Sequence, residues 1–147
     1  MTTYGIRRIS ASETRPLRHF VLRPHQRPED LVYPGDDAPD TLHLDLSVEG
    51  EQRAVASMFR EPLPGTPDAS AYRLRGMAVL PEHQGLGYGA ALVHACIEHA
   101  RQHGGTRLWC NARTTAAGFY RKLGFEADGA EFELPGIGPH YLMSRPV

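Results

Sequence analysis

The chain has 147 residues, of which 41% are hydrophobic and 22% charged, as is typical of one globular domain with a single core. Its formal net charge of −1 argues against a nucleic-acid-binding module, because such modules carry a clear basic excess. Two cysteines are too few for a disulfide framework, and no apolar leader or membrane-length apolar run occurs, so we expect free thiols in a cytoplasmic protein with no membrane contact.

The chain begins with a predicted strand and a predicted helix. Weak alternation of apolar and polar residues over residues 2–10 predicts the strand. The stretch "SASETRPLRHFVLRPHQ", residues 10–26, predicts the helix, with Ser12 or Thr14 as its cap. Helical spacing places three apolar residues on one face of this helix: Leu17, Phe20 and Val21.

Three further strands are predicted before the middle of the chain. Alternating leucines predict a strand over residues 41–50, and a turn at "EGEQ" leads into a returning strand over residues 53–61. A third strand, "AYRLRGMAVLP", covers residues 71–81. The segments between these strands, residues 27–40 and 62–70, are rich in Pro, Gly and Asp and are predicted to be loops.

In the second half of the chain, helices alternate with strands. An apolar stripe predicts a helix from about Gly87 to His103, which the glycines of "HGG" end. A strand "TRLWCNA", a short helix closed by Gly124, a strand "FEAD" and a last hairpin around "PGIGP" follow. This order predicts an α/β fold with a mixed, α+β-like sheet, and residues 1–147 form one domain because no repeat or linker interrupts them.

Three alternating glycines, Gly85, Gly87 and Gly89, lie where the third strand turns into the long helix. The start of a helix presents unpaired N–H groups and the positive end of the helix dipole, and glycines let a diphosphate approach them. We therefore predict a pyrophosphate cradle, although such a turn can also serve tight helix–sheet packing. The dinucleotide fingerprint G-x-G-x-x-A also fits, but its acidic residue is absent after "LWCNA", and no P-loop motif occurs.

The segment "MAVLPEHQGLGYGAALV" resembles the acetyl-CoA-binding segment of the GNAT superfamily of N-acetyltransferases, whose core is Gln/Arg-x-x-Gly-x-Gly/Ala. The resemblance continues into "NARTTAAGFYRKLGFE", which matches the family in an Asn at a strand end, a Tyr on the next helix and a Leu-Gly-Phe. Together the two segments span residues 75–126, about a third of the chain. The resemblance implies the GNAT fold: a mostly antiparallel central sheet with one splayed parallel pair, flanked by about four helices. The chain's two ends are similar to a bacterial subgroup with unassigned acceptors.

The resemblance also implies an activity and a set of site residues. It implies transfer of an acetyl group from acetyl-CoA, as co-substrate, to a primary amine of a small molecule or peptide by direct attack in a ternary complex. It makes Tyr120 the general acid that protonates the departing thiolate, and Asn111 a ligand of the pantetheine arm. It implies no metal, and it allows a homodimer. The acetyl-CoA-binding residues that it implies are Met77, Ala78, Val79, Gln84, Gly85, Leu86, Gly87, Tyr88, Gly89 and Asn111.

The base that would deprotonate the acceptor amine stays open. Many members of the family have a glutamate on the strand before the glycine turn, but "YRLRGMAV" has no carboxylate. His83, His140, Glu131 and Glu133 are candidates, and a partly neutral amine would need no base. A missing base also fits a non-catalytic acyl-CoA-binding or sensing domain of the same fold.

Several other patterns have an ordinary structural interpretation beside a functional one. Six acidic residues in and near the first loop could form a rim that attracts a cationic amine, or could simply be solvated. Arg113 and Arg121 could meet the CoA 3′-phosphate or face solvent. Cys96, His99 and His103 share a helix face, but their spacing fits no standard zinc motif. The six acidic residues are Glu29, Asp30, Asp36, Asp37, Asp40 and Asp45.

Overall fold

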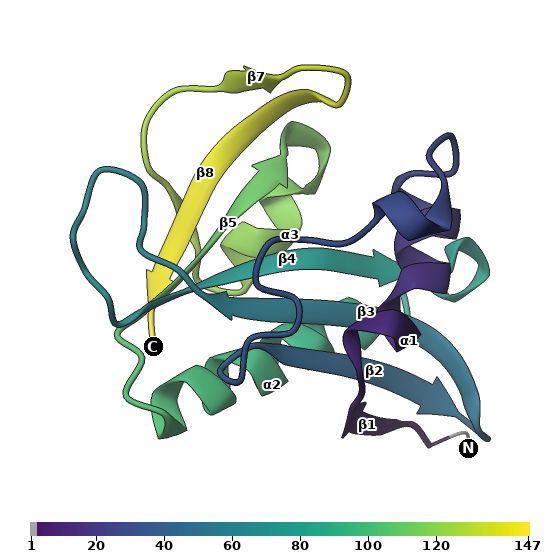
Figure 1. The fold of residues 1–147 in the computed structure, drawn as a ribbon. Coiled ribbons are helices and arrows are strands. Elements are labelled where there is room, and N and C mark those ends of the chain that lie inside the picture. Colours follow the sequence, from purple (N-terminus) through teal and green to yellow (C-terminus); the bar gives the residue numbers. More distant parts are fainter. Residues whose placement is uncertain (1–2) are drawn as a thin grey trace. The chain divides into compact units, whose positions relative to one another are not determined.

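The computed structural model describes residues 3–147 and divides into two compact units (Figure 1). The first unit comprises the chain up to Phe59 together with Leu74–Cys96, and the second comprises Arg60–Arg73 and Ile97–Val147. The strand order is β1-β2-β3-β4-β5-β8-β6, with β7 also paired to β8. The predicted mixed sheet is confirmed, since β4 runs parallel to β5, whereas β1 with β2, β2 with β3, and β5, β6 and β7 with β8 are antiparallel.

The first unit contains the antiparallel strands β1, β2 and β3. β1 pairs with β2, and β2 pairs with β3 through a turn at Glu49 and Gly50, as predicted. Short helical turns cover Arg18–Leu22, which is π-helical, and Pro28–Asp30 and Pro81–His83, which are 3-10. The longer elements are β1 (Gly5–Arg8), α1 (Ala11–Leu17), β2 (Leu42–Val48), β3 (Glu51–Arg60), β4 (Ala71–Val79) from Leu74 onward, and α2 (Tyr88–Gln102) up to Cys96.

The second unit is built on a long antiparallel pair. β5 pairs with β8 along its whole length, as Figure 1 shows, and the short strands β6 and β7 also pair with β8. The start of β4 runs parallel to β5. The elements that the second unit adds are β5 (Arg107–Arg113), a 3-10 turn (Thr114–Ala116), α3 (Ala117–Lys122), β6 (Glu126–Ala127), β7 (Phe132–Leu134) and β8 (Gly138–Pro146).

Within residues 3–147, three α-helices form where about four were expected. Ser10 caps the start of helix α1: its side chain accepts the Glu13 N–H, and the Glu13 carboxylate accepts the Ser10 N–H. This capping box replaces the predicted caps at Ser12 and Thr14, because only Ser10 has a glutamate three residues later. The π-helical turn after Leu17 rotates the following residues, so Phe20 is 61% exposed rather than buried with Leu17.

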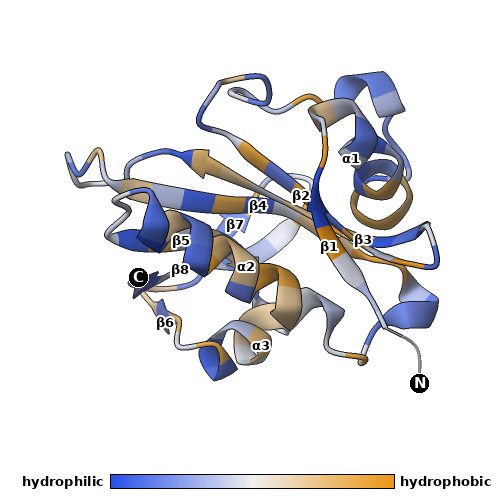
Figure 2. Cartoon of the chain, turned by 90° about the horizontal axis from the view of Figure 1, so that it is seen from below, coloured by the Kyte–Doolittle hydropathy of each residue, from blue (hydrophilic) through white to orange (hydrophobic). Residues whose placement is uncertain are grey.

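The cores follow the predicted apolar patterns. Along β2, the alternating residues Leu42, Leu44, Leu46 and Val48 are all buried. Helix α2 is amphipathic, with hydrophobic and hydrophilic segments alternating along it in Figure 2. Within residues 3–147, no helix is both long and apolar enough to cross a membrane. The predicted stripe of α2 is confirmed, since all its members are buried: Leu92, Val93, Cys96, Ile97 and Ala100.

Candidate functional site

The glycine turn lies between the 3-10 turn Pro81–His83 and helix α2, in the first unit. Gly85 has φ +80° and Gly87 has φ +85°, so both need the left-handed conformation that favours glycine. A Cβ added at either position would meet nothing within 4 Å, which leaves open space above the turn. Gly89 differs, because it already lies within helix α2.

The turn presents backbone donors at the start of a long helix. The Ala91 N–H donates to the Gly87 carbonyl at 3.0 Å and closes the first turn of α2. The N–H groups that precede it in the first turn have no acceptor within the helix. The first turn of α2 contains no acidic residue that would repel an anion. These features suit an anion at this helix start.

The turn is tied to the strands beside it. The Gln84 side chain donates to the Val79 carbonyl at 3.2 Å, and the Leu80 N–H donates to the Arg53 carbonyl at 3.0 Å. Arg53 also donates to the Tyr88 hydroxyl at 3.4 Å, and Tyr88 is only 9% exposed. Leu86, at the tip of the turn, is 59% exposed. The backbone of the turn is therefore anchored at both ends, while its tip faces solvent.

Strand β4 leads into this turn. Its register with β5 covers only Ala71–Arg73 against Arg107–Trp109, whereas β4 continues to Val79. Gly76 interrupts the strand with φ +67°, a local irregularity that re-aims a strand. Of the three residues expected to bind pantetheine, Ala78 is buried, and Met77 and Val79 are half-buried.

Asn111 and Tyr120 lie in the second unit. Asn111 is half-buried on β5, opposite Leu142 on β8. Tyr120 is 8% exposed on α3, and its ring makes edge contacts with Phe119 and Phe125 at centroid distances of 5.0 and 5.3 Å. The aromatic packing holds the Tyr120 ring in a fixed orientation, which a proton donor needs.

The candidate bases have different surroundings. His83 is half-buried in the first unit, with its ring 6.4 Å from that of Tyr88. His140, in the second unit, is 3% exposed, and its Nδ1 lies 2.7 Å from the Gly138 carbonyl oxygen. Glu131 and Glu133 are exposed, also in the second unit. Of the four, only His83 therefore shares the unit of the glycine turn.

Two of the six acidic residues fit neither a rim that attracts an amine nor a solvated loop, because they are buried. Asp36 and Asp45 are buried and pair with Arg18 and Arg7, respectively, while Asp30 pairs with Arg27 on the surface. Burial raises the pKa of Asp36, but hydrogen bonds from Arg18 and the Tyr33 N–H and the charge of Arg18 outweigh it, so its pKa lies below the usual range. Four of the six acidic residues, including Glu29, which lies 3.7 Å from Arg27, therefore pair with arginines.

A buried network that the sequence does not reveal supports the first loop. Arg18 donates to both oxygens of Asp36 at 2.8 and 3.0 Å, and its guanidinium also reaches the Leu31 carbonyl and the Ser57 hydroxyl. The side chains of Arg18 and Asp36 are 0% and 1% exposed. His43 completes the network through Ser57, with Nδ1 2.7 Å from the Ser57 Oγ. No local pattern around Arg18 distinguishes it from a surface arginine.

Burial or ring contacts account for most of the remaining candidates. Cys96 and Cys110 are buried free thiols, and burial raises the pKa of each to about 12. His99 and His103 stack their rings at 3.9 Å, and among residues 3–147 no group of three or more potential ligands could hold a metal. Arg113 is exposed, and Arg121 lies 5.9 Å from the Tyr141 ring.

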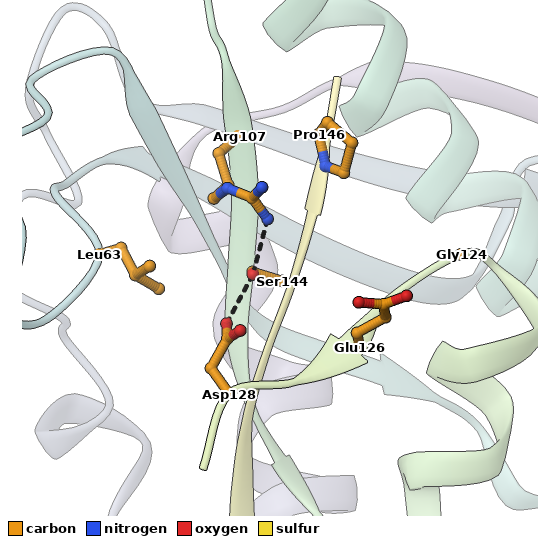
Figure 3. A pocket seen from close by; sticks show the side chains of 7 residues that line it. All are labelled: Leu63, Arg107, Gly124, Glu126, Asp128, Ser144 and Pro146. Atoms are coloured by element: carbon orange, nitrogen blue, oxygen red, sulfur yellow. Dashed lines mark hydrogen bonds between the residues drawn. The ribbon is translucent and has the colours of Figure 1, made fainter.

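A pocket of about 660 Å³ lies in the second unit and contains none of the expected site residues (Figure 3). Arg107 donates to the Ser144 hydroxyl at 2.8 Å, and that hydroxyl donates to Asp128 at 2.6 Å. Figure 3 shows these two hydrogen bonds, which link the three side chains in a row. The residues that line the pocket are Leu63, Arg107, Gly124, Glu126, Asp128, Ser144 and Pro146.

Comparison with known proteins decides the family. Residues 6–125, which include parts of both units, match the profile of the acetyltransferase (GNAT) family. The chain belongs to the GNAT acetyltransferase family. It is 38% identical over 140 residues to the uncharacterized N-acetyltransferase YitI of Bacillus subtilis, a match that covers 95% of this chain and 94% of that protein. This GNAT protein is thus an acyltransferase, which disfavours both the sensing domain and the dinucleotide-dependent enzyme.

Solved structures agree on the GNAT fold. Escherichia coli ElaA matches with a TM-score of 0.76 at 21% identity and covers 99% of both chains. The ribosomal-protein-S18-alanine N-acetyltransferase of Escherichia coli matches with a TM-score of 0.76 at 18% identity, over 98% of this chain and 94% of that one. An aminoglycoside 6′-N-acetyltransferase complexed with coenzyme A matches with a TM-score of 0.71 at 14% identity, over 97% and 96%.

Proposed function

We propose that this GNAT protein transfers an acetyl group from acetyl-CoA to a primary amine of a small molecule or peptide, by direct attack in a ternary complex. The observation that carries the proposal is the turn before α2, where Gly85 and Gly87 both have positive φ and open space in place of a side chain. The solved coenzyme A complex of the aminoglycoside acetyltransferase, which has this fold, supports the choice of donor.

The residues of the turn fit a pyrophosphate. Its oxygens are multiple hydrogen bond acceptors, and the first turn of α2 offers N–H donors with no acidic side chain among them. We assign the pyrophosphate to the backbone of residues 84–89. Arg53, held against Tyr88, adds a positive charge beside this helix start.

We assign the pantetheine arm to the backbone of Met77, Ala78 and Val79 and to the side chain of Asn111. Extended amides bind to a strand by β-augmentation, and β4 continues beyond the residues that it pairs with β5. When bound, acetyl-CoA supplies an acyl group activated as a thioester.

The chemistry of the transfer needs one proton removed and one supplied. As the amine nitrogen bonds to the acetyl carbon, the carbon–sulfur bond breaks and leaves a thiolate, whose conjugate acid has a pKa of about 8.5. We assign the Tyr120 hydroxyl as the donor of a proton to that sulfur, with solvent restoring the phenol. The amine's own proton passes to solvent or to a base, for which His83 is the candidate in the unit of the glycine turn.

We also propose that residues 1–147 act as one domain in the cytoplasm, where free buried thiols such as Cys96 and Cys110 are stable. The resemblance to a family in which dimers are common also makes a homodimer part of the proposal. Sedimentation of the purified chain, with a monomer mass of 16.3 kDa as reference, tests the oligomeric state directly.

Calorimetric titration of acetyl-CoA, with NADH as the control ligand, tests the proposal. We expect micromolar binding of acetyl-CoA and none of NADH. A Gly87→Glu variant puts a carboxylate where the pyrophosphate would lie, so binding should be lost. Gly104→Glu is the matched control, because Gly104 also has positive φ, at +76°, and open space around it. Absence of binding to folded wild-type protein would overturn the proposal.

A further inference from the structure

The pocket of the second unit lies on one face of the strands β5, β8 and β6. On this face Ser144 of β8 is opposite Glu126 of β6, and Asp128 follows Glu126 by two positions, which places both acidic side chains on the same side. The volume of about 660 Å³ falls within the range of about 300–1,000 Å³ that is usual for small-molecule sites. The pocket therefore has room for a small ligand.

A buried hydroxyl holds two opposite charges in place within this pocket. Ser144 is 3% exposed, and its Oγ accepts a hydrogen bond from the Arg107 Nη1 at 2.8 Å and donates to the Asp128 Oδ2 at 2.6 Å (Figure 3). The Asp128 backbone N–H also donates to the Leu142 carbonyl at 2.7 Å, which anchors the carboxylate. The guanidinium and the carboxylate thus lie on two sides of one hydroxyl oxygen, bridged by it rather than paired directly.

Both charged groups keep hydrogen-bonding capacity that the chain does not use. Within residues 3–147, the Asp128 Oδ1 accepts no hydrogen bond, and the Nε and Nη2 groups of Arg107 donate none. An α-amino acid carries an ammonium and a carboxylate on one carbon atom, so its two charged groups match this short spacing. Its ammonium would donate to Asp128, and its carboxylate would accept from Arg107.

Glu126 gives the pocket an excess of negative charge. Its carboxylate is exposed and makes no hydrogen bond or ion pair within residues 3–147. Two residues along a strand span about 7 Å, so Glu126 lies about that far along the sheet from Asp128. A second cationic group, on a chain of three or four methylene groups, would cover this distance. Leu63 and Pro146 add apolar surface to the lining for such methylene groups.

We propose that this pocket binds a free α-amino acid with a cationic side chain. Asp128 binds the α-ammonium, Arg107 the α-carboxylate and Glu126 the cation of the side chain, so that two carboxylates and one guanidinium meet two cations and one carboxylate. The pocket contains none of the residues that we assign to acetyl-CoA or to acetyl transfer, so this inference does not rest on the proposed function.

Calorimetric titration of three ligands into the full chain, without acetyl-CoA, tests the inference. The ligands are L-lysine, L-norleucine, which lacks the side-chain ammonium, and 1,5-diaminopentane, which lacks the carboxylate. One charge-assisted hydrogen bond is worth about tenfold in affinity. We therefore expect L-lysine to bind about tenfold more tightly than either of the other two ligands.

Three variants assign each charge of the ligand to one residue. Glu126→Gln should remove the advantage of L-lysine over L-norleucine, and Arg107→Gln should remove its advantage over 1,5-diaminopentane. Asp128→Asn should weaken all three ligands about tenfold, and its amide oxygen can still accept from Ser144. Because Glu126 is exposed and unbonded among the described residues, its variant should fold like the wild type. Glu98→Gln is the matched control, since Glu98 is an exposed acid of the second unit outside the pocket.

Absence of saturable L-lysine binding to folded wild-type protein would overturn the inference. Equal affinities for L-lysine and L-norleucine, or the same L-lysine affinity in all three pocket variants as in Glu98→Gln, would also overturn it. The Gly87→Glu variant separates this result from the test of the proposed function. It should lose acetyl-CoA but still bind L-lysine, because Gly87 does not line the pocket.

Discussion

Replacement of Asp36 by Asn should destabilise the protein more than replacement of any surface acid. Asp36 and Arg18 form a bidentate pair whose side chains are 1% and 0% exposed. The asparagine keeps the shape of the side chain but removes its charge. The Arg18 guanidinium would then stay charged and buried without a counter-ion, because an arginine does not lose its proton in a protein.

The expected loss is about 3–5 kcal/mol in the free energy of unfolding, the cost of leaving one partner of a buried ion pair uncompensated. In a chain of this size, each kcal/mol lowers Tm by about 2–4 °C, so the midpoint should fall by roughly 6–20 °C. Asp45→Asn is the matched control. Asp45 is equally buried, but its partner Arg7 is 61% exposed and can return to water, so this variant should cost about 1 kcal/mol.

Urea unfolding followed by far-ultraviolet circular dichroism gives the free energies of unfolding of the wild type and the two variants. The pH dependence supplies a second measurement. Because the folded-state pKa of Asp36 is lowered, its stabilisation is complete above the unfolded-state pKa of about 4 and is lost as the pH falls through the folded-state value. The gap between wild type and Asp36→Asn should therefore narrow below about pH 4.

Equal losses in Asp36→Asn and Asp45→Asn, within about 1 kcal/mol, would refute this reasoning. Such a result would mean that the burial of the arginine partner does not set the cost. A gap that stays constant down to about pH 2 would contradict the pKa argument separately.

Two further predictions concern single groups. Tyr120→Phe should lower turnover by about 10²–10⁴-fold with acetyl-CoA affinity kept, as steady-state rates and calorimetry would show, while Tyr141→Phe serves as the control. Unchanged turnover would remove Tyr120 from the mechanism. Cys96 and Cys110 should react with a thiol reagent at pH 8 only as fast as the protein opens, because burial raises the pKa of each thiol to about 12. Fast labelling of the native protein would contradict this.

Much of the fold could be predicted because local patterns determine it. The alternation of Leu42, Leu44 and Leu46 identifies β2, and the apolar stripe of α2 follows from helical spacing. The glycine turn was predicted for the same reason, since positive φ at Gly85 and Gly87 is a local backbone requirement that only glycine meets at low cost.

The errors in the sequence-based prediction lie where tertiary context decides. Phe20 has the spacing of a buried residue, but the π-helical turn Arg18–Leu22 changes the rotation per residue and turns it toward solvent. On β2 the alternation predicts one apolar face, yet His43 and Asp45 on the other face are also buried, because partners distant in sequence cover them.

The burial of a charged residue is difficult to predict from sequence, because the oppositely charged residue that stabilises it can lie anywhere in the chain. Arg18 finds Asp36 across 18 positions, although the acidic residues around Asp36 looked like one solvated loop. Arg73 and Arg75 show the same point within a single strand. In "YRLRGMAV" the two arginines are equivalent, yet one meets Glu61 and Trp109 and the other meets Tyr33. The different surroundings of the two arginines therefore depend on the fold, and the sequence pattern alone does not distinguish them.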